Sequence, residues 1–258
     1  MRPFNARSLV LSILLGLDPP TLPARSLVAV GELFGIAGGT VRTALSRMVA
    51  SGELTADGDG YRLVGRLLER KAAQDIGRAP APGDWDGSWW LAVVTAPRRS
   101  IAERRAFRTD MANLRMGELR PDTWMRPANL DGPAGIASLA IVRGELDGED
   151  PVQLAARLWP LIEMADEAGA LIERIDTLEP TLGDDGRALP PAITLAAEVV
   201  RLLRAEPLLP SALTPQPWPV DALRARYRSF DRAIGRAMAR AVGQPGAMRR
   251  PKSSSNLA

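Results

Sequence analysis

Residues 39–54, with the sequence GTVRTALSRMVASGEL, constrain the fold of this chain more than any other stretch. At about 100° per residue of an α-helix, their apolar and polar side chains separate onto opposite sides. The inner side holds Val41, Ala44, Leu45, Met48 and Val49, and the outer side holds Arg42, Thr43, Ser46, Arg47 and Ala50. Thr40 is a suitable N-cap, and Ser51-Gly52 ends the helix because glycine reaches the left-handed conformation at little cost. We expect one face in the core and the other free to contact a partner.

The segments before this helix predict two more helices. Asn5 caps the first and Pro23 opens the second. Their inner residues are expected to be Leu9, Ile13, Leu17, Leu27, Val30 and Phe34. Residues 35–39 form the turn that leads into the third helix.

The segment after this helix predicts a β-hairpin. Its arms are residues 53–56 and 60–64, and its tip is Asp57, Gly58 and Asp59, a composition that favours tight reversal. A short helix over residues 66–76 follows. Together these elements predict a winged helix-turn-helix domain over residues 1–76.

The outer face of the third helix has the chemistry of a DNA reader. Arg42 and Arg47 can make bidentate contacts to guanine edges in a major groove, and neighbouring hydroxyls can contact phosphates. The predicted DNA-binding residues are Thr40, Arg42, Thr43, Ser46 and Arg47. The alternative is an ordinary surface helix with solvated arginines.

The composition argues against most enzyme chemistry. The chain of 258 residues has no cysteine and no histidine, which removes the thiolate nucleophile, the usual general base and the commonest metal ligand. Carboxylates, hydroxyls and two lysines, Lys71 and Lys252, remain. We therefore predict no catalytic residue, no metal site and no cofactor.

The high isoelectric point is not by itself a sign of nucleic-acid binding. A pI of 9.9 accompanies a net charge of only +3, because almost nothing titrates between the carboxylates and the tyrosines. The apolar residues 9–17 are too short to span a membrane, and no signal peptide is evident. The expected location is cytoplasmic, without a membrane partner.

Residues 77–84 have the composition of a linker, and a second domain is predicted over residues 85–180. Its expected elements are a buried strand at 88–96, a helix at 98–115, a turn and strand at 117–126, a strand at 136–146, and a long helical stretch from Pro151. The helix at 98–115 is expected to have its arginines outside and four apolar residues inside, Ile101, Phe107, Met111 and Leu114. This order predicts a ferredoxin-like α+β sandwich. Residues 147–150, DGED, fit a turn that ends in a helix cap better than a metal loop.

A helical C-terminal domain is predicted over residues 181–243. One helix runs from Pro191 towards Glu206-Pro207, residues 208–219 form an ordered proline-rich connection, and a final helix covers residues 220–242. Beside the apolar face of that last helix runs a stripe of arginines, Arg224, Arg228, Arg232, Arg236 and Arg240, which suits either phosphates or a solvated face. Residues 244–258 are expected to be a disordered tail.

The order of these parts resembles the PaaX family of bacterial transcriptional repressors. Four segments carry the resemblance: VRTALSRMVASGEL followed by YRL, WDGSWWLAVV, LRPDTWMRPANL at residues 119–130, and EPLLPSALTPQPWP at residues 206–219. It implies a winged helix domain, a central ferredoxin-like domain similar to Cas2, and a helical C-terminal domain. It also implies a homodimer that binds operator DNA of an aromatic-acid, phenylacetate-type, catabolic operon and releases it when an aryl acyl-CoA binds.

The resemblance assigns Arg42 and Arg47 to the recognition helix. Two positions depart from the family. Its wings usually carry an Arg-Gly-Arg-like run, where this chain has Asp57, Gly58 and Asp59. The helix before Glu206-Pro207 often contains a histidine in the family, and the corresponding positions of this chain are Ala196, Ala197 and Glu198.

The small-molecule effector is expected at the final helix. Arginines suit the phosphates of an acyl-CoA, and aromatic side chains suit its acyl group. The predicted effector residues are Trp218, Tyr227, Arg228, Phe230 and Arg232. The alternative functions are a Cas2-like metal-dependent nuclease, an acyl-CoA-processing enzyme with a winged helix, or a scaffold. Against the nuclease, Val93, Val94 and Thr95 stand where a metal-binding aspartate is needed.

Overall fold

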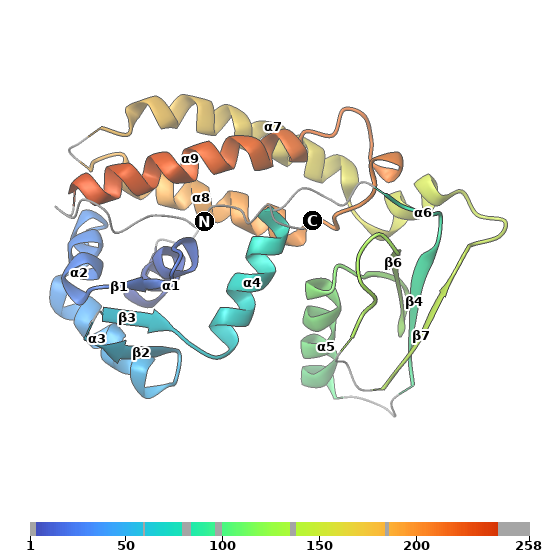
Figure 1. Cartoon of the computed structure of the whole chain (residues 1–258), viewed down its shortest axis with the longest axis horizontal. Coiled ribbons are helices and arrows are strands. Elements are labelled where there is room, and N and C mark those ends of the chain that lie inside the picture. Colours follow the sequence, from blue (N-terminus) through green and yellow to red (C-terminus); the bar gives the residue numbers. More distant parts are fainter. Residues whose placement is uncertain are drawn as a thin grey trace, which may run out of the picture. The chain divides into compact units, whose positions relative to one another are not determined.

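The computed structural model describes residues 4–58, 60–78, 84–95, 100–134, 138–183 and 186–241. The chain forms two compact units, and each combines segments that are distant in the sequence. The first unit contains Met1–Ala72, Leu171–Val199 and Ala225–Ala258, and the second contains Ala73–Ala170 and Val200–Arg224. Three long helices therefore each contribute to both units: α7 (Leu161–Leu178), α8 (Leu189–Ala205) and α9 (Val220–Ala241) (Figure 1).

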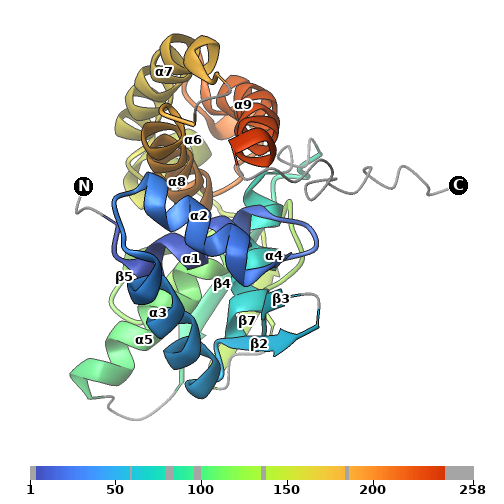
Figure 2. The same ribbon diagram turned by 90° about the vertical axis from the view of Figure 1, so that its left-hand side faces the viewer.

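The first unit contains the predicted winged helix-turn-helix (Figure 2). Its elements are α1 (Ala6–Gly16), β1 (Thr21–Leu22), α2 (Ala24–Leu33), α3 (Gly38–Ala50), β2 (Leu54–Asp57), β3 (Gly60–Leu63) and the first half of α4 (Arg66–Arg78). The strands pair antiparallel in the order β1-β3-β2. The hairpin is as predicted, whereas the two-residue strand β1 is too short to leave a periodic pattern.

The helix caps confirm some predictions and correct one. The Asn5 side chain accepts a hydrogen bond from the Ser8 amide at 2.8 Å, as a cap of α1 should. Thr40, predicted to cap α3, lies inside that helix, because the two preceding glycines are already helical and Ala37 is the N-cap. Gly52, with φ +71°, ends α3 as predicted.

The core of the first unit joins the winged helix to the C-terminal helices. Buried apolar residues include Leu9, Leu14, Leu27, Val30, Val41, Leu45, Met48, Leu171, Ile175 and Phe230. A Cβ on Gly186 would lie 3.3 Å from Ala241 Cβ and 3.4 Å from Leu33 Cδ2, so α2, α9 and the loop before α8 meet there. Val49, predicted on the inner side of α3, is 36% exposed.

The second unit is built on a four-stranded antiparallel sheet. Its elements are β4 (Trp89–Val94), α5 (Ile101–Asn113), β5 (Gly117–Arg120), β6 (Thr123–Pro127), β7 (Leu139–Gly144) and α6 (Pro151–Leu158). The strand order is β5-β6-β4-β7, which places the first strand beside the third and fourth, as in a ferredoxin-like sheet.

The connections differ in detail from the predicted ones. The segment 117–126 contributes to two strands with a tight turn between them, where one strand was expected. The predicted helical stretch after Pro151 is divided into α6 and α7, because Pro160 lacks an amide hydrogen and interrupts the helix. Helix α4 extends to Arg78, two residues into the predicted linker; the rest of it up to residue 83 lies outside the described residues, as does the tail from residue 242.

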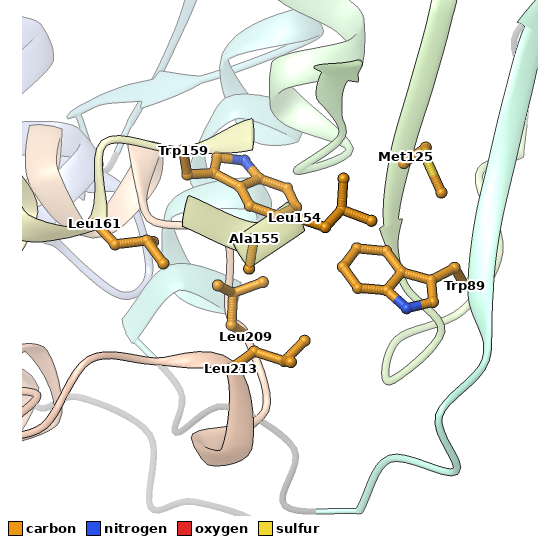
Figure 3. Packing of buried hydrophobic residues seen from close by; sticks show 8 residues of the cluster. All are labelled: Trp89, Met125, Leu154, Ala155, Trp159, Leu161, Leu209 and Leu213. Carbon is orange, nitrogen blue, oxygen red and sulfur yellow. The ribbon is translucent and has the colours of Figure 1, made fainter. Parts of the chain in front are cut away.

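Both faces of this sheet are covered by apolar side chains. On one face, Ala92 and Trp124 pack with Met111 of α5. On the other, the cluster in Figure 3 contains Trp89, Met125, Leu154, Ala155, Trp159, Leu161, Leu209 and Leu213. The proline-rich connection 208–219 is therefore ordered because Leu209 and Leu213 belong to this core. Ile101, predicted to point inward from α5, is 80% exposed.

Two arginines predicted on the surface are buried in the second unit. Arg224 is 3% exposed and forms an ion pair with Glu206, which is 1% exposed, while its Nε donates to the Gly77 carbonyl oxygen at 3.1 Å. Arg115 is 7% exposed and donates to the Glu206 carbonyl oxygen. Burial raises the pKa of Glu206, an effect that the charges of Arg224 and Arg115 oppose. Arg224 is therefore a structural residue and not a member of the exposed stripe.

Arg224→Met is expected to destabilise the protein by about 3 to 5 kcal/mol, because it leaves the Glu206 carboxylate buried without its partner. Arg236→Met, an exposed arginine on the same helix, should change the free energy of unfolding by less than about 0.5 kcal/mol. Urea denaturation of the two variants tests this. Equal stabilities would contradict a structural role for Arg224.

Candidate nucleic-acid interface

Helix α3 presents its predicted outer face to solvent. Arg42, Thr43, Ser46 and Arg47 are all exposed, while Val41, Leu45 and Met48 are buried. Thr40 is also exposed, in the first turn of the helix. The Thr43 hydroxyl donates a hydrogen bond to the Gly39 carbonyl oxygen at 2.9 Å. While this bond is made, the hydroxyl can serve a partner only as a hydrogen-bond acceptor. The structure thus places all five predicted DNA-binding residues on one exposed helix.

Helix α3 can present this polar face to solvent because its opposite side packs closely on α2. A Cβ on Gly31 would lie 2.5 Å from Val41 Cγ2, so the two helices approach where α2 has no side chain. Val41, Leu45 and Met48 are each at most 1% exposed. Fully burying such side chains stabilises the fold by about 1.5 to 3 kcal/mol each. The position of the arginines is therefore set by the core and not by contacts of their own.

A hollow of about 850 Å³ lies beside α3 on the same unit. Its lining comes from the start of α1, from α3 and from the segment leading into β2: Asn5, Ala6, Arg7, Ala37, Gly39, Thr40, Thr43, Ala44, Arg47, Met48, Ser51 and Glu53. Three of the five predicted DNA-binding residues, Thr40, Thr43 and Arg47, thus share one concave surface with the N-terminus of α1. Hydroxyl, guanidinium and amide groups of this kind suit the phosphates that flank a major groove.

Arg7 is the residue of this surface that the sequence analysis missed. Its Nε donates to Glu53 Oε2 at 3.0 Å, and a second hydrogen bond joins Nη2 to Oε1. The Arg7 side chain is 55% exposed, so it remains accessible to a partner. The partners lie 46 residues apart, a separation that no helical or strand periodicity reveals.

This ion pair shifts the pKa of each group so that its charged form is favoured. The hydrogen bond from Arg7 lowers the pKa of Glu53, against the smaller opposing effect of burial. The same bond raises the pKa of Arg7. The pair joins α1 to the segment between α3 and the wing, and both residues line the hollow.

The wing contributes little positive charge at its tip. Asp57 ends β2 and Gly58 follows it, while Asp59 lies outside the described residues. The exposed Arg62 lies on β3, where its Nε donates to Thr21 Oγ1 at 3.1 Å. The exposed arginines Arg42, Arg47, Arg7 and Arg62 therefore lie on α3, α1 and β3.

The predicted effector residues are not equally accessible. Arg228 and Arg232 are exposed on α9, whereas Tyr227 is 2% exposed and Phe230 is 0% exposed in the core of the first unit. Trp218 belongs to the second unit and packs against its apolar cluster. Glu198 forms an ion pair with Arg174.

The loop 147–150 is a helix cap, as predicted. Asp150 is the N-cap of α6, its Oδ1 accepts from the Val152 amide at 2.8 Å, and Pro151 occupies the first turn. Among the described residues, no three Asp or Glu side chains are grouped in a way that could hold a metal ion. None of the described helices is long and apolar enough to cross a membrane.

The fold and the exposed face of α3 define a winged-helix protein with a central Cas2-like domain. The family model described as PaaX-like protein matches residues 5–67, and the model described as PaaX protein central Cas2-like domain matches residues 82–135. The chain belongs to the PaaX-like family, and its general role is that of a PaaX-like regulator.

A solved structure supports the whole architecture. The uncharacterized protein Rv0674 from Mycobacterium tuberculosis is 36% identical to this chain and superposes with a TM-score of 0.70. The match covers 92% of this chain and 98% of that one. No curated protein matches the chain in sequence.

Glu53→Gln is expected to reduce stability near pH 7 by about 0.5 kcal/mol, the size typical of a solvent-exposed ion pair. Because the folded-state pKa of Glu53 is lowered, its contribution is complete above the unfolded-state pKa and is lost as the pH falls through the folded-state value. Paired urea titrations of wild type and variant at neutral and acidic pH measure the difference. A difference that grows on acidification would contradict the ion pair.

Proposed function

We propose that this protein is a transcriptional repressor that binds operator DNA as a homodimer and releases it when an aryl acyl-CoA binds. The observation that carries the proposal is the exposed face of α3, with Arg42 and Arg47 held outward by a helix whose other side is core. Membership of the PaaX-like family supports DNA binding in general. The operon is proposed to encode aromatic-acid catabolism of the phenylacetate type.

In this proposal α3 enters the major groove and contacts base edges. Arg42 and Arg47 donate bidentate hydrogen bonds to guanine, the commonest specific contact in such interfaces. Thr40, Ser46 and Arg7 face the flanking backbone, where hydroxyl and guanidinium groups bind phosphate oxygens. One helix of this length contacts too few base pairs for specificity, so two copies on a repeated half-site are needed.

The protein is proposed to act by binding and not by catalysis. A nuclease of the Cas2 type needs a metal-binding acid at the end of the first strand, and β4 ends at Val94 with Thr95 after it. The chain also has no histidine to take that place. These features favour a regulator over the nuclease.

The effector is proposed to bind at α9 of the first unit. Arg228 and Arg232 are exposed one turn apart and can bind the phosphates of a CoA thioester. Because Tyr227 and Phe230 are buried, entry of an aryl group beside them requires α9 to shift. Since α9 packs in the same unit as the winged helix, such a shift can lower operator affinity.

Arg42→Ala and Arg47→Ala should each weaken operator binding by about 1 to 3 kcal/mol if the arginines bind guanine edges. Binding is measured by fluorescence anisotropy with the DNA upstream of the protein's own operon, beside a scrambled duplex. Arg120→Ala, an exposed arginine of the second unit, is the matched control and should bind like wild type. Wild-type affinity in both α3 variants would exclude this helix as the reader.

Arg228→Ala combined with Arg232→Ala should weaken phenylacetyl-CoA binding at least about tenfold while operator affinity and its salt dependence stay unchanged, because the lost contacts are to phosphates of the ligand. Calorimetric titration gives the first quantity and anisotropy at two salt concentrations gives the second. Arg236→Ala on the same helix is the control. A flattened salt dependence with intact CoA binding would assign these arginines to DNA.

A further inference from the structure

The ion pair between Arg7 and Glu53 occupies only one edge of the Arg7 guanidinium. Nε and Nη2 donate to the two carboxylate oxygens of Glu53, and the Nε–Oε2 distance is 3.0 Å. A guanidinium carries five N–H donors in a plane, one on Nε and two on each Nη. The other three, two on Nη1 and one on Nη2, form no hydrogen bond within the residues that the structure describes. The edge formed by Nη1 and Nη2, here called the end-on edge, is therefore available to a partner.

The backbone holds both members of this pair in place. Arg7 lies in the first turn of α1, which Asn5 caps. The Glu53 amide donates to the Met48 carbonyl oxygen at 2.9 Å, and the Glu53 carbonyl oxygen accepts from the Val64 amide at 3.2 Å. The carboxylate therefore projects from a backbone that is hydrogen-bonded on both sides. An arginine that binds such a carboxylate with two donors has a restricted orientation.

The end-on edge belongs to a surface that suits phosphate. Arg7 lines the hollow beside α3 together with Thr40 and Arg47. Among its lining residues Arg7 and Arg47 are the basic ones, and Glu53 is the acidic one. Because Glu53 is paired with Arg7, the charge of Arg47 remains to attract an anion. Two parallel N–H donors of a guanidinium match two oxygens of a phosphate.

We propose that Glu53 is a positioning residue, which holds the end-on edge of Arg7 ready for one backbone phosphate of bound DNA. Glu53 itself does not touch the DNA. The proposal deepens the proposed function and rests on it for DNA as the partner of this surface. It adds a residue whose negative charge strengthens the binding of a polyanion.

Two opposing effects of Glu53 on DNA affinity can be compared. Its carboxylate repels phosphate, but this charge is paired with Arg7, and salt screens exposed charges over about 8 Å at physiological ionic strength. The favourable effect is entropic, because a long side chain loses rotamer freedom when a partner immobilises it. That loss corresponds to about two- to tenfold in affinity, and Glu53 imposes it before DNA binds. The hydrogen bond from Arg7 lowers the pKa of Glu53 and so keeps the carboxylate ionised at neutral pH. Ordering of Arg7 is therefore the larger effect.

Glu53→Gln tests the sign of this effect. The amide of glutamine has one oxygen that accepts and an NH2 group that cannot, so it loses the two-donor contact with Arg7. The variant should bind duplex DNA about two- to tenfold more weakly at about 0.15 M salt, although it removes a negative charge. Glu69→Gln, at an exposed acid of α4 in the same unit, controls for charge alone and should bind at least as tightly as wild type. Anisotropy measures both, and a Glu53→Gln affinity equal to or above that of Glu69→Gln overturns the proposal.

A double-mutant cycle separates positioning from a general structural effect. Arg7→Ala alone should weaken binding at least about tenfold and reduce the salt slope by about 0.9, the value for one phosphate contact. In the Arg7→Ala background, Glu53→Gln should no longer weaken binding, because no arginine remains to be positioned. A loss from Glu53→Gln that is the same with and without Arg7 overturns the proposal. Circular dichroism of each variant establishes that it is folded.

The outcome is separable from that of the proposed function, because a phosphate contact does not depend on base sequence. The cycle is therefore measured on both the upstream DNA and the scrambled duplex. Coupling between Arg7 and Glu53 on both, with preference for the upstream DNA, supports both proposals. Coupling without that preference refutes the proposed repressor and leaves the role of Glu53 standing. Preference without coupling overturns only the role of Glu53, and a protein that binds neither duplex overturns both.

Discussion

The ion pair between the buried Glu206 carboxylate and Arg224 is the interaction on which the second unit depends most. Glu206 follows the last residue of α8, receives the guanidinium of Arg224 from α9, and its Oε1 accepts from the Leu208 amide at 3.0 Å. Through Arg224 it is linked to the Gly77 carbonyl oxygen near the end of α4. Arg115, which follows α5, donates to the carbonyl oxygen of the same Glu206. Groups from the ends of α4, α5 and α8 and from the start of α9 therefore meet at the ion pair between Glu206 and Arg224. Their geometry is coupled because none of these groups can move without leaving a buried charge or carbonyl unpaired.

The apolar pattern determined most of what the sequence could predict. Helices α1, α2 and α3 have inner faces that repeat at helical spacing, and the strand at Trp89 is an uninterrupted apolar run. The exposed face of α3 followed from the same pattern, because placing Leu45 and Met48 inside leaves Arg42 and Arg47 outside. Helices, strands and faces of this kind can be predicted without knowing which distant residues contact them.

Several errors concern contacts between distant residues. Arg115 and Arg224 resemble other surface arginines in the sequence, and only the fold brings them to Glu206. Arg7 likewise joins the α3 surface through Glu53, a partner that no local pattern indicates. The predicted cap at Thr40 failed for a different reason, since a Gly-Gly pair can enter a helix one turn earlier than propensity suggests.

The shared helices α7, α8 and α9 limit how this architecture can be rearranged. A winged helix in many proteins is a contiguous segment that recombination can move between genes as one piece. Here the compact unit that contains the winged helix also contains Leu171–Val199 and the chain from Ala225. No single cut therefore releases this unit whole, and a nascent chain cannot complete the unit until α9 has been synthesised. Any rearrangement that keeps this unit must therefore also keep the segments of α7, α8 and α9 that belong to it.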